Sequence, residues 1–176
     1  IALLMGSLAA EPAWLVSVLG ADPEEVASLA PALRASAAAD ALLFTRWVLV
    51  MTNFERALYA DPDGDLDAAW WDLVERYQLV PRPEGVRPGA WAAKLHVACA
   101  PVYYHTYLYG KFVAAQLAAT VERECGGIVD TPSAGRLLVE RIFRPGLSVR
   151  WDRLIEQATG EPLDVAHFAR VIDGAA

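Results

Sequence analysis

The stretch that decides the fold lies at residues 40–59 and reads DALLFTRWVLVMTNFERALY. Its large apolar side chains recur every three or four residues, which places them on one side of an α-helix. These residues are Leu42, Leu43, Trp47, Val50, Met51, Phe54 and Leu58. The pattern predicts a long helix from about Ala32 to Tyr59 that buries this stripe.

The rest of the chain also has a helical pattern. Ala, Leu, Glu and Arg dominate, and the alternation of β-branched residues that is typical of strands is absent. We therefore expect an all-α fold, a packed array of about seven helices. The expected helices cover residues 1–19, 22–31, 32–59, 65–78, 91–124, 130–144, 148–159 and 163–172. Pro31 should interrupt the helix that begins at Asp22, and Pro101 should kink or break the region 91–124.

Length and composition narrow the possible classes of protein. A chain of 176 residues with 55% hydrophobic residues can fill one compact domain over residues 1–176. The net charge of −7 argues against nucleic-acid binding, which needs clustered positive charge. The most membrane-like stretch, residues 97–120, contains Lys111 and is expected to be a buried helix, so no membrane partner is predicted. Cys99 and Cys125 are expected to be reduced and partly buried.

One short region gathers most of the groups that could bind a substrate. Lys94 and His96 are followed by Tyr103, Tyr104 and Tyr107. A lysine can pair with a carboxylate, and a phenol or an imidazole can donate a hydrogen bond to a carbonyl oxygen or an oxyanion. The tyrosines lie three and four residues apart, so they can stack along one side of a helix. Residue types alone also fit a packed stripe of tyrosines with their hydroxyls at its edge.

The chain lacks a complete catalytic motif. It contains no His-Glu-x-x-His sequence and no phosphate-binding loop, and its three histidines do not have metal-ligand spacing. We therefore expect no metal site within this chain. It opens at Ile1 inside an apolar run without a helix cap, which suggests a segment of something longer.

A resemblance to a known family covers most of the chain, most strongly residues 44–168. Residues 69–78, AWWDLVERYQ, resemble the Trp-Trp-Glu-Leu-x-x-x-Tyr-Gln segment of the angiotensin-converting-enzyme family of zinc peptidyl-dipeptidases. In that family a loop, a Lys-Phe-His motif and a tyrosine-bearing helix follow, as here at residues 81–89, 94–96 and 103–109. Ala-Gly-x-x-Leu and Thr-Gly-x-Pro stretches come next, here at residues 134–138 and 159–162. The tyrosine helix is also similar to that of oligoendopeptidases of the thimet and F types.

The resemblance implies a role for each of the candidate residues. Lys94 would bind the C-terminal carboxylate of a peptide substrate, and His96 would hydrogen-bond a substrate carbonyl. Tyr107 would stabilise the tetrahedral oxyanion if the alignment is shifted by one residue. Tyr103 and Tyr104 are then alternatives for the second, carboxylate-binding tyrosine.

The resemblance further implies that this chain is the C-terminal, substrate-binding part of a zincin-like helical peptidase domain. The parent protein would be a peptidyl-dipeptidase or oligopeptidase, and its zinc ligands would lie upstream, in the other half of the catalytic domain. We therefore expect the chain alone to be inactive. The alternative is a non-catalytic helical binding module that has lost the metal site.

Overall fold

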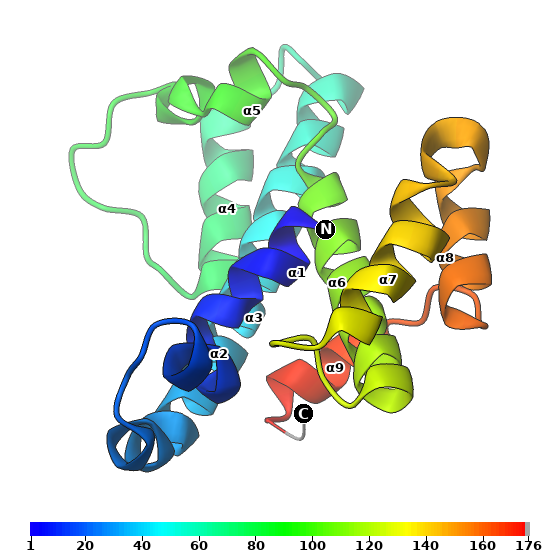
Figure 1. Cartoon of the computed structure of the whole chain (residues 1–176). Coiled ribbons are helices and arrows are strands. Elements are labelled where there is room, and N and C mark those ends of the chain that lie inside the picture. The colour runs from blue at the N-terminus through cyan, green and yellow to red at the C-terminus, as the bar shows by residue number, and fades with distance from the viewer. Residues whose placement is uncertain (175–176) are drawn as a thin grey trace. The chain divides into compact units, whose positions relative to one another are not determined.

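The computed structural model describes residues 1–174, and these residues form helices, turns and loops without a strand (Figure 1). The predicted all-α multi-helix fold is confirmed. The α-helices are α1 (Ala2–Ser7), α2 (Pro12–Ser17), α3 (Pro23–Ala60), α4 (Leu66–Gln78), α5 (Leu95–Ala98), α6 (His105–Cys125), α7 (Pro132–Leu138), α8 (Trp151–Thr159) and α9 (Ala166–Ile172). Shorter helical turns are η1 (Leu8–Ala10), η2 (Ala90–Ala93), the π-helical η3 (Val139–Phe143) and η4 (Gly146–Ser148).

The chain divides into two compact units. The first unit comprises Ile1–Ala39 and Gly110–Ala176, and the second comprises Asp40–Tyr109. Each unit has its own hydrophobic core. The prediction of a single domain over residues 1–176 stays a prediction.

The core of the first unit is built on α6. Apolar side chains from α1, α7, η3 and α8 pack around it. They are Leu4, Ala134, Leu137, Leu138, Ile142, Ile155 and Ala158, and the same core contains Leu117 and Val121 of α6. A fully buried polar residue, Gln116, ties this core to the chain after α8. Its Nε2 donates to the Thr159 hydroxyl at 2.9 Å, and its Oε1 accepts from the backbone N–H of Asp164 at 2.8 Å.

The core of the second unit lies between α4 and the part of α3 that follows residue 40, two segments that run side by side in Figure 1. Its buried residues are Val50, Met51, Phe54, Trp70 and Val74. The Trp70 ring meets Phe54 edge-on with centroids 5.0 Å apart. This is a preferred arrangement of aromatic rings and orients the two helices.

The expected buried stripe of α3 is only partly buried. Val50, Met51 and Phe54 are in the core, but Leu42 and Leu43 are 44% and 53% exposed. The prediction was wrong for these two leucines because no element of the second unit covers their side of α3.

Three prolines test where the helices should break. Pro31 lies inside α3, so the predicted interruption there is wrong: the flanking alanine-rich turns are strong helix formers and the helix continues past one missing hydrogen bond. The single helix expected over 1–19 instead ends before Glu11, whose backbone is extended because Pro12 follows it. Pro101 does break the region 91–124, between α5 and α6.

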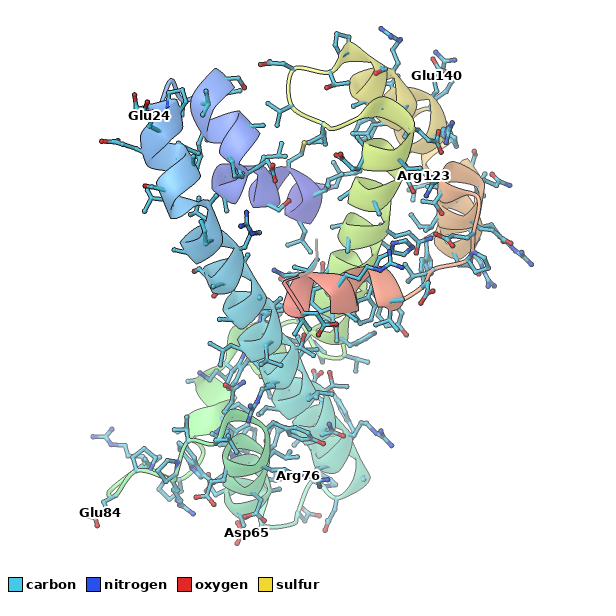
Figure 2. All side chains as sticks on the ribbon, turned by 90° about the horizontal axis from the view of Figure 1, so that it is seen from below. Glu24, Asp65, Arg76, Glu84, Arg123 and Glu140 are labelled. Atoms are coloured by element: carbon cyan, nitrogen blue, oxygen red, sulfur yellow. The ribbon has the colours of Figure 1, made fainter. Side chains whose placement is uncertain are left out.

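Aspartate side chains cap the N-termini of α3 and α4, at the helix starts predicted for Asp22 and Asp65. The Asp22 side chain accepts from the backbone N–H groups of Glu24 and Glu25 at 2.9 and 3.0 Å. Asp65 accepts from that of Ala68 at 2.9 Å. Asp65 is labelled in Figure 2, and so is Glu84, which lies at the outer end of the loop that follows α4. Satisfying the otherwise unpaired N–H groups of the first turn stabilises a helix start.

Two further expectations are modified: the partial burial of both cysteines and the position of the most membrane-like stretch. Cys99 and Cys125 are both free, but Cys99 is exposed and only Cys125 is partly buried. We expected residues 97–120 to be the most membrane-like stretch, but among residues 1–174 the helix that is long and apolar enough to cross a membrane is α3, with 11% of its apolar window buried. That property alone does not assign the helix to a membrane, since core helices and signal sequences share it.

Candidate functional site

The candidate residues belong to the second unit, in the segment from η2 to the first turn of α6. Lys94 has an extended backbone and precedes α5, which carries His96. The chain then turns at residues 99–104, and α6 begins at His105. Tyr103 and Tyr104 therefore lie just before the helix, although we expected them on it. Their carbonyl groups accept the backbone N–H groups of Thr106 and Tyr107, which joins the turn to α6.

His96, Tyr103, Tyr104 and Tyr107 come together in what we call the histidine–tyrosine cluster. The imidazole lies at its centre. The His96 ring centroid is 4.8 Å from that of Tyr104 and 5.5 Å from that of Tyr107, both edge-on. Tyr103 stacks on the same imidazole at 6.2 Å. The tyrosine rings also contact one another, with Tyr107 at 5.5 Å from Tyr103 and 5.3 Å from Tyr104.

A hydrogen bond joins the two residues that could act on a carbonyl oxygen. His96 Nε2 and the Tyr107 hydroxyl are 3.1 Å apart. When His96 carries its proton on Nε2, it donates to the phenolic oxygen and leaves the Tyr107 O–H free to donate elsewhere. With the proton on Nδ1, the phenol donates to the imidazole instead.

The cluster has both a shielded and an open side. Tyr103 is 48% exposed, whereas Tyr104 is partly buried beside Phe44, with ring centroids 6.4 Å apart. Burial raises the pKa of the Tyr104 phenol above its usual value, an effect that a hydrogen bond with the Trp47 side chain opposes and the charge of Tyr107 reinforces. Tyr104 therefore stays a neutral hydrogen-bonding group at any ordinary pH.

Lys94 lies outside the histidine–tyrosine cluster. Its ammonium nitrogen is over the face of Trp47, 5.2 Å from the ring centroid, in cation–π geometry. The residue is exposed and makes no ion pair with residues 1–174. Trp47 links the two parts of the region, because its side chain also interacts with Tyr104. The charge of Lys94 thus remains available to an anion.

Glu55 was not among the residues predicted from the sequence. Its side chain is buried, and Oε1 accepts the backbone N–H of Val102 at 2.7 Å. The signal in the sequence is its place in α3: Glu55 lies four residues after Met51, on the buried side of an otherwise apolar stripe. A carboxylate at such a position needs a hydrogen-bond partner, and that partner comes from a distant loop that helical periodicity cannot identify.

An open groove with a volume of about 640 Å³ lies along α3 in the same unit. Its lining residues are Thr52, Asn53, Glu55, Arg56, Ala57, Tyr59, Ala60, Val102 and His105. Neither Lys94, His96 nor Tyr107 lines this groove. It meets the candidate region only at Glu55, Val102 and His105.

The described residues do not fit a zinc site. Within residues 1–174 no group of three or more His, Cys, Asp or Glu side chains is arranged to hold a metal ion. Three or four such ligands are needed for zinc in proteins. The zinc that the resemblance implies would therefore need ligands from outside these residues.

Comparisons of the chain with protein-family models, with curated proteins and with solved structures found no match. The relationship to the angiotensin-converting-enzyme family stays a prediction from the sequence. What the structure adds is local: it brings one imidazole and three phenols into contact and sets a lysine over the neighbouring tryptophan.

Proposed function

We propose that this chain is the peptide-binding part of a zinc metallopeptidase, either a peptidyl-dipeptidase or an oligopeptidase. The single observation that carries the proposal is the 3.1 Å hydrogen bond between His96 Nε2 and the Tyr107 hydroxyl. The two residues that the resemblance assigns to the substrate carbonyl and the oxyanion are therefore direct neighbours. The zinc of the parent enzyme rests on the resemblance alone.

The role of the pair is to present the Tyr107 hydroxyl as a hydrogen-bond donor, because His96 that carries its proton on Nε2 donates to the phenolic oxygen and leaves the Tyr107 O–H free. Peptide hydrolysis passes through a tetrahedral intermediate in which the carbonyl oxygen becomes negatively charged. Donors that are already fixed in place stabilise this charge more than donors that must reorganise, and one such donor contributes about 10²–10³ to kcat. Packing among the rings of Tyr103, Tyr104 and Tyr107 holds His96 and the Tyr107 hydroxyl in place.

Lys94 would supply charge recognition. An exposed ammonium that already rests on an indole face needs little rearrangement to meet the carboxylate of a peptide. Tyr103, the most exposed ring of the cluster, can add a hydroxyl donor to the same ligand. Tyr104 has a supporting place, since it is partly buried between Phe44 and His96.

The binding role can be tested on this chain. The probes are an N-acetylated tripeptide with a free C-terminal carboxylate and the same peptide as its C-terminal amide, titrated by calorimetry and by NMR. We expect the acid to shift the ring signals of His96 and Tyr107. Tyr107→Phe and His96→Gln should each weaken its binding about tenfold, the value of one hydrogen bond of about 1.4 kcal/mol.

The same titration separates Lys94 from the cluster. Lys94→Gln should weaken binding of the acid but leave binding of the amide unchanged. The matched control is Tyr59→Phe, which removes a phenolic hydroxyl from the same unit outside the cluster and should leave both affinities unchanged. Equal binding of the acid by the wild-type chain and by Tyr107→Phe would contradict the proposal.

The peptidase assignment needs the natural gene product. Intact mass and terminal sequencing would show whether residues precede Ile1 in that protein. We expect a His-Glu-x-x-His motif and a later glutamate upstream, together with peptide hydrolysis that a chelator abolishes and zinc restores. A natural protein without that motif would rule out the zinc peptidase and leave the helical binding module.

A further inference from the structure

The turn that carries Tyr103 and Tyr104 is held by one side chain from another helix. Glu55 of α3 is only 5% exposed, and its Oε1 accepts the Val102 N–H at 2.7 Å. Val102 immediately precedes the two tyrosines. The bond joins residues 47 positions apart in the sequence, so it fixes the turn to the core helix of the second unit.

The backbone of Val102 is strained. Its φ angle is +55°, in the left-handed region that L-residues with a branched Cβ avoid. A residue stays in that region only where its surroundings determine its conformation. The Val102 side chain is 61% exposed, so packing of its own methyl groups does not supply this restraint. The hydrogen bond that the Val102 N–H donates to Glu55 is a restraint of this kind.

The carboxylate of Glu55 has no other described partner. Among residues 1–174 it makes no ion pair, and the Val102 N–H is the one donor that reaches it. A buried carboxylate with a single hydrogen bond stabilises a core poorly, because its removal from water is unfavourable. Its charge does strengthen the bond that it accepts. The Glu55 carboxylate therefore fixes the position of the turn but adds little to the stability of the core.

We infer that Glu55 is a positioning residue that holds Val102 in its left-handed conformation and thereby sets Tyr103 and Tyr104 against the imidazole of His96. The link is short. Tyr103 and Tyr104 follow Val102 directly, and their carbonyl groups accept the first N–H groups of α6. Releasing Val102 therefore releases one side of the histidine–tyrosine cluster. The effect on peptide binding rests on the proposed function, but the effect on the cluster does not.

The test uses a loss and a rescue. Glu55→Ala should shift the NMR ring signals of His96 and Tyr103 and weaken binding of the free-acid tripeptide about tenfold. Glu55→Gln keeps the shape of the side chain and an acceptor oxygen, so it should give an intermediate result. Adding Val102→Gly to Glu55→Ala should restore most of the lost affinity and the wild-type ring signals, because glycine adopts a positive φ without strain.

A matched control separates this rescue from a general gain in stability. Leu79 also has a positive φ angle, +58°, in the same unit. Leu79→Gly should relieve its strain in the same way, yet it should not restore the cluster in Glu55→Ala. Equal rescue by both glycines, or no rescue by Val102→Gly, would overturn the positioning role.

The two failures can be told apart. Ring signals that move in Glu55→Ala and return with Val102→Gly establish the positioning role even if the wild-type chain binds no peptide, in which case the proposed function fails. Ring signals that stay unchanged in both Glu55→Gln and Glu55→Ala refute the positioning role whatever the peptide affinity. Because glutamine is nearly the same size as glutamate, Glu55→Gln still supplies the measurement if Glu55→Ala does not fold.

Discussion

Tyr104 shows how one residue can be set apart from chemically identical neighbours. It is the partly buried phenol of the cluster, and burial raises its pKa above the usual 10.0. Tyr103 has the same side chain one position earlier and is half exposed. The two alternatives that the sequence left open thus differ in environment: Tyr103 is half exposed, and Tyr104 is partly buried against the imidazole of His96.

The raised pKa of Tyr104 predicts a loss of stability at alkaline pH. In the unfolded chain this phenol ionises near pH 10, whereas the folded chain still holds its proton. The contribution of Tyr104 to folding is therefore complete below pH 10 and declines as the pH rises through the higher folded pKa. Unfolding by urea, followed between pH 9 and about 11, should show a decline that Tyr104→Phe reduces. An unchanged decline in Tyr104→Phe would contradict the assignment, and Tyr59→Phe is the exposed control.

Glycines at helix ends and helix interiors have opposite roles. Gly160 ends α8 with a φ angle of +88°, and its N–H donates to the carbonyl of Glu156 at 2.8 Å. Gly135 lies inside α7, and a methyl group added there would meet nothing within 4 Å. Substitution of glycine by alanine should therefore change the free energy of unfolding in opposite directions at Gly160 and Gly135.

Gly160→Ala should lower the free energy of unfolding by about 1–2 kcal/mol, because alanine is strained in the left-handed conformation. Gly135→Ala should raise it by about 0.5–1 kcal/mol, because alanine loses less conformational freedom on forming a helix. Denaturant unfolding of both variants checks the pair. A loss of stability of equal size in both would mean that backbone conformation is not the cause.

The elements also show what periodicity can predict. It identified the helical regions that form α3, α4 and α6, because helix propensity acts over a few neighbouring positions. It misplaced the effect of Pro31, since a missing hydrogen bond does not end a helix whose flanking turns are strong. It also put Tyr103 and Tyr104 on a helix, whereas Pro101 and the strained Val102 delay the start of α6 to His105.

At the scale of the whole molecule, two separate cores are present. Phe54 belongs to the core of the second unit and Leu117 to that of the first. Residue patterns predicted a buried stripe for α3 and a buried helix over residues 97–120, but they could not show that these two helices would contribute to different cores. The same holds for the site, since the pairing of Glu55 with Val102 joins segments that no local pattern connects.

Substitutions in the two cores should have different effects on the cluster. Phe54→Ala and Leu117→Ala each leave a cavity and should lower the free energy of unfolding by about 3–5 and 2–5 kcal/mol respectively. Below the unfolding transition, Phe54→Ala should shift the NMR ring signals of His96 and Tyr107, whereas Leu117→Ala should leave them in place. Equal shifts in both variants would show that the cluster depends on both cores.

Cys99 offers a way to watch the turn directly. It is an exposed thiol between α5 and Pro101, while Cys125 is partly buried in the other unit. Exposure favours modification of the first thiol over the second. A spin label attached there would report motion three residues from Val102, so the tether supplied by Glu55 becomes visible as a change in label mobility, without any substrate, metal or assay of activity.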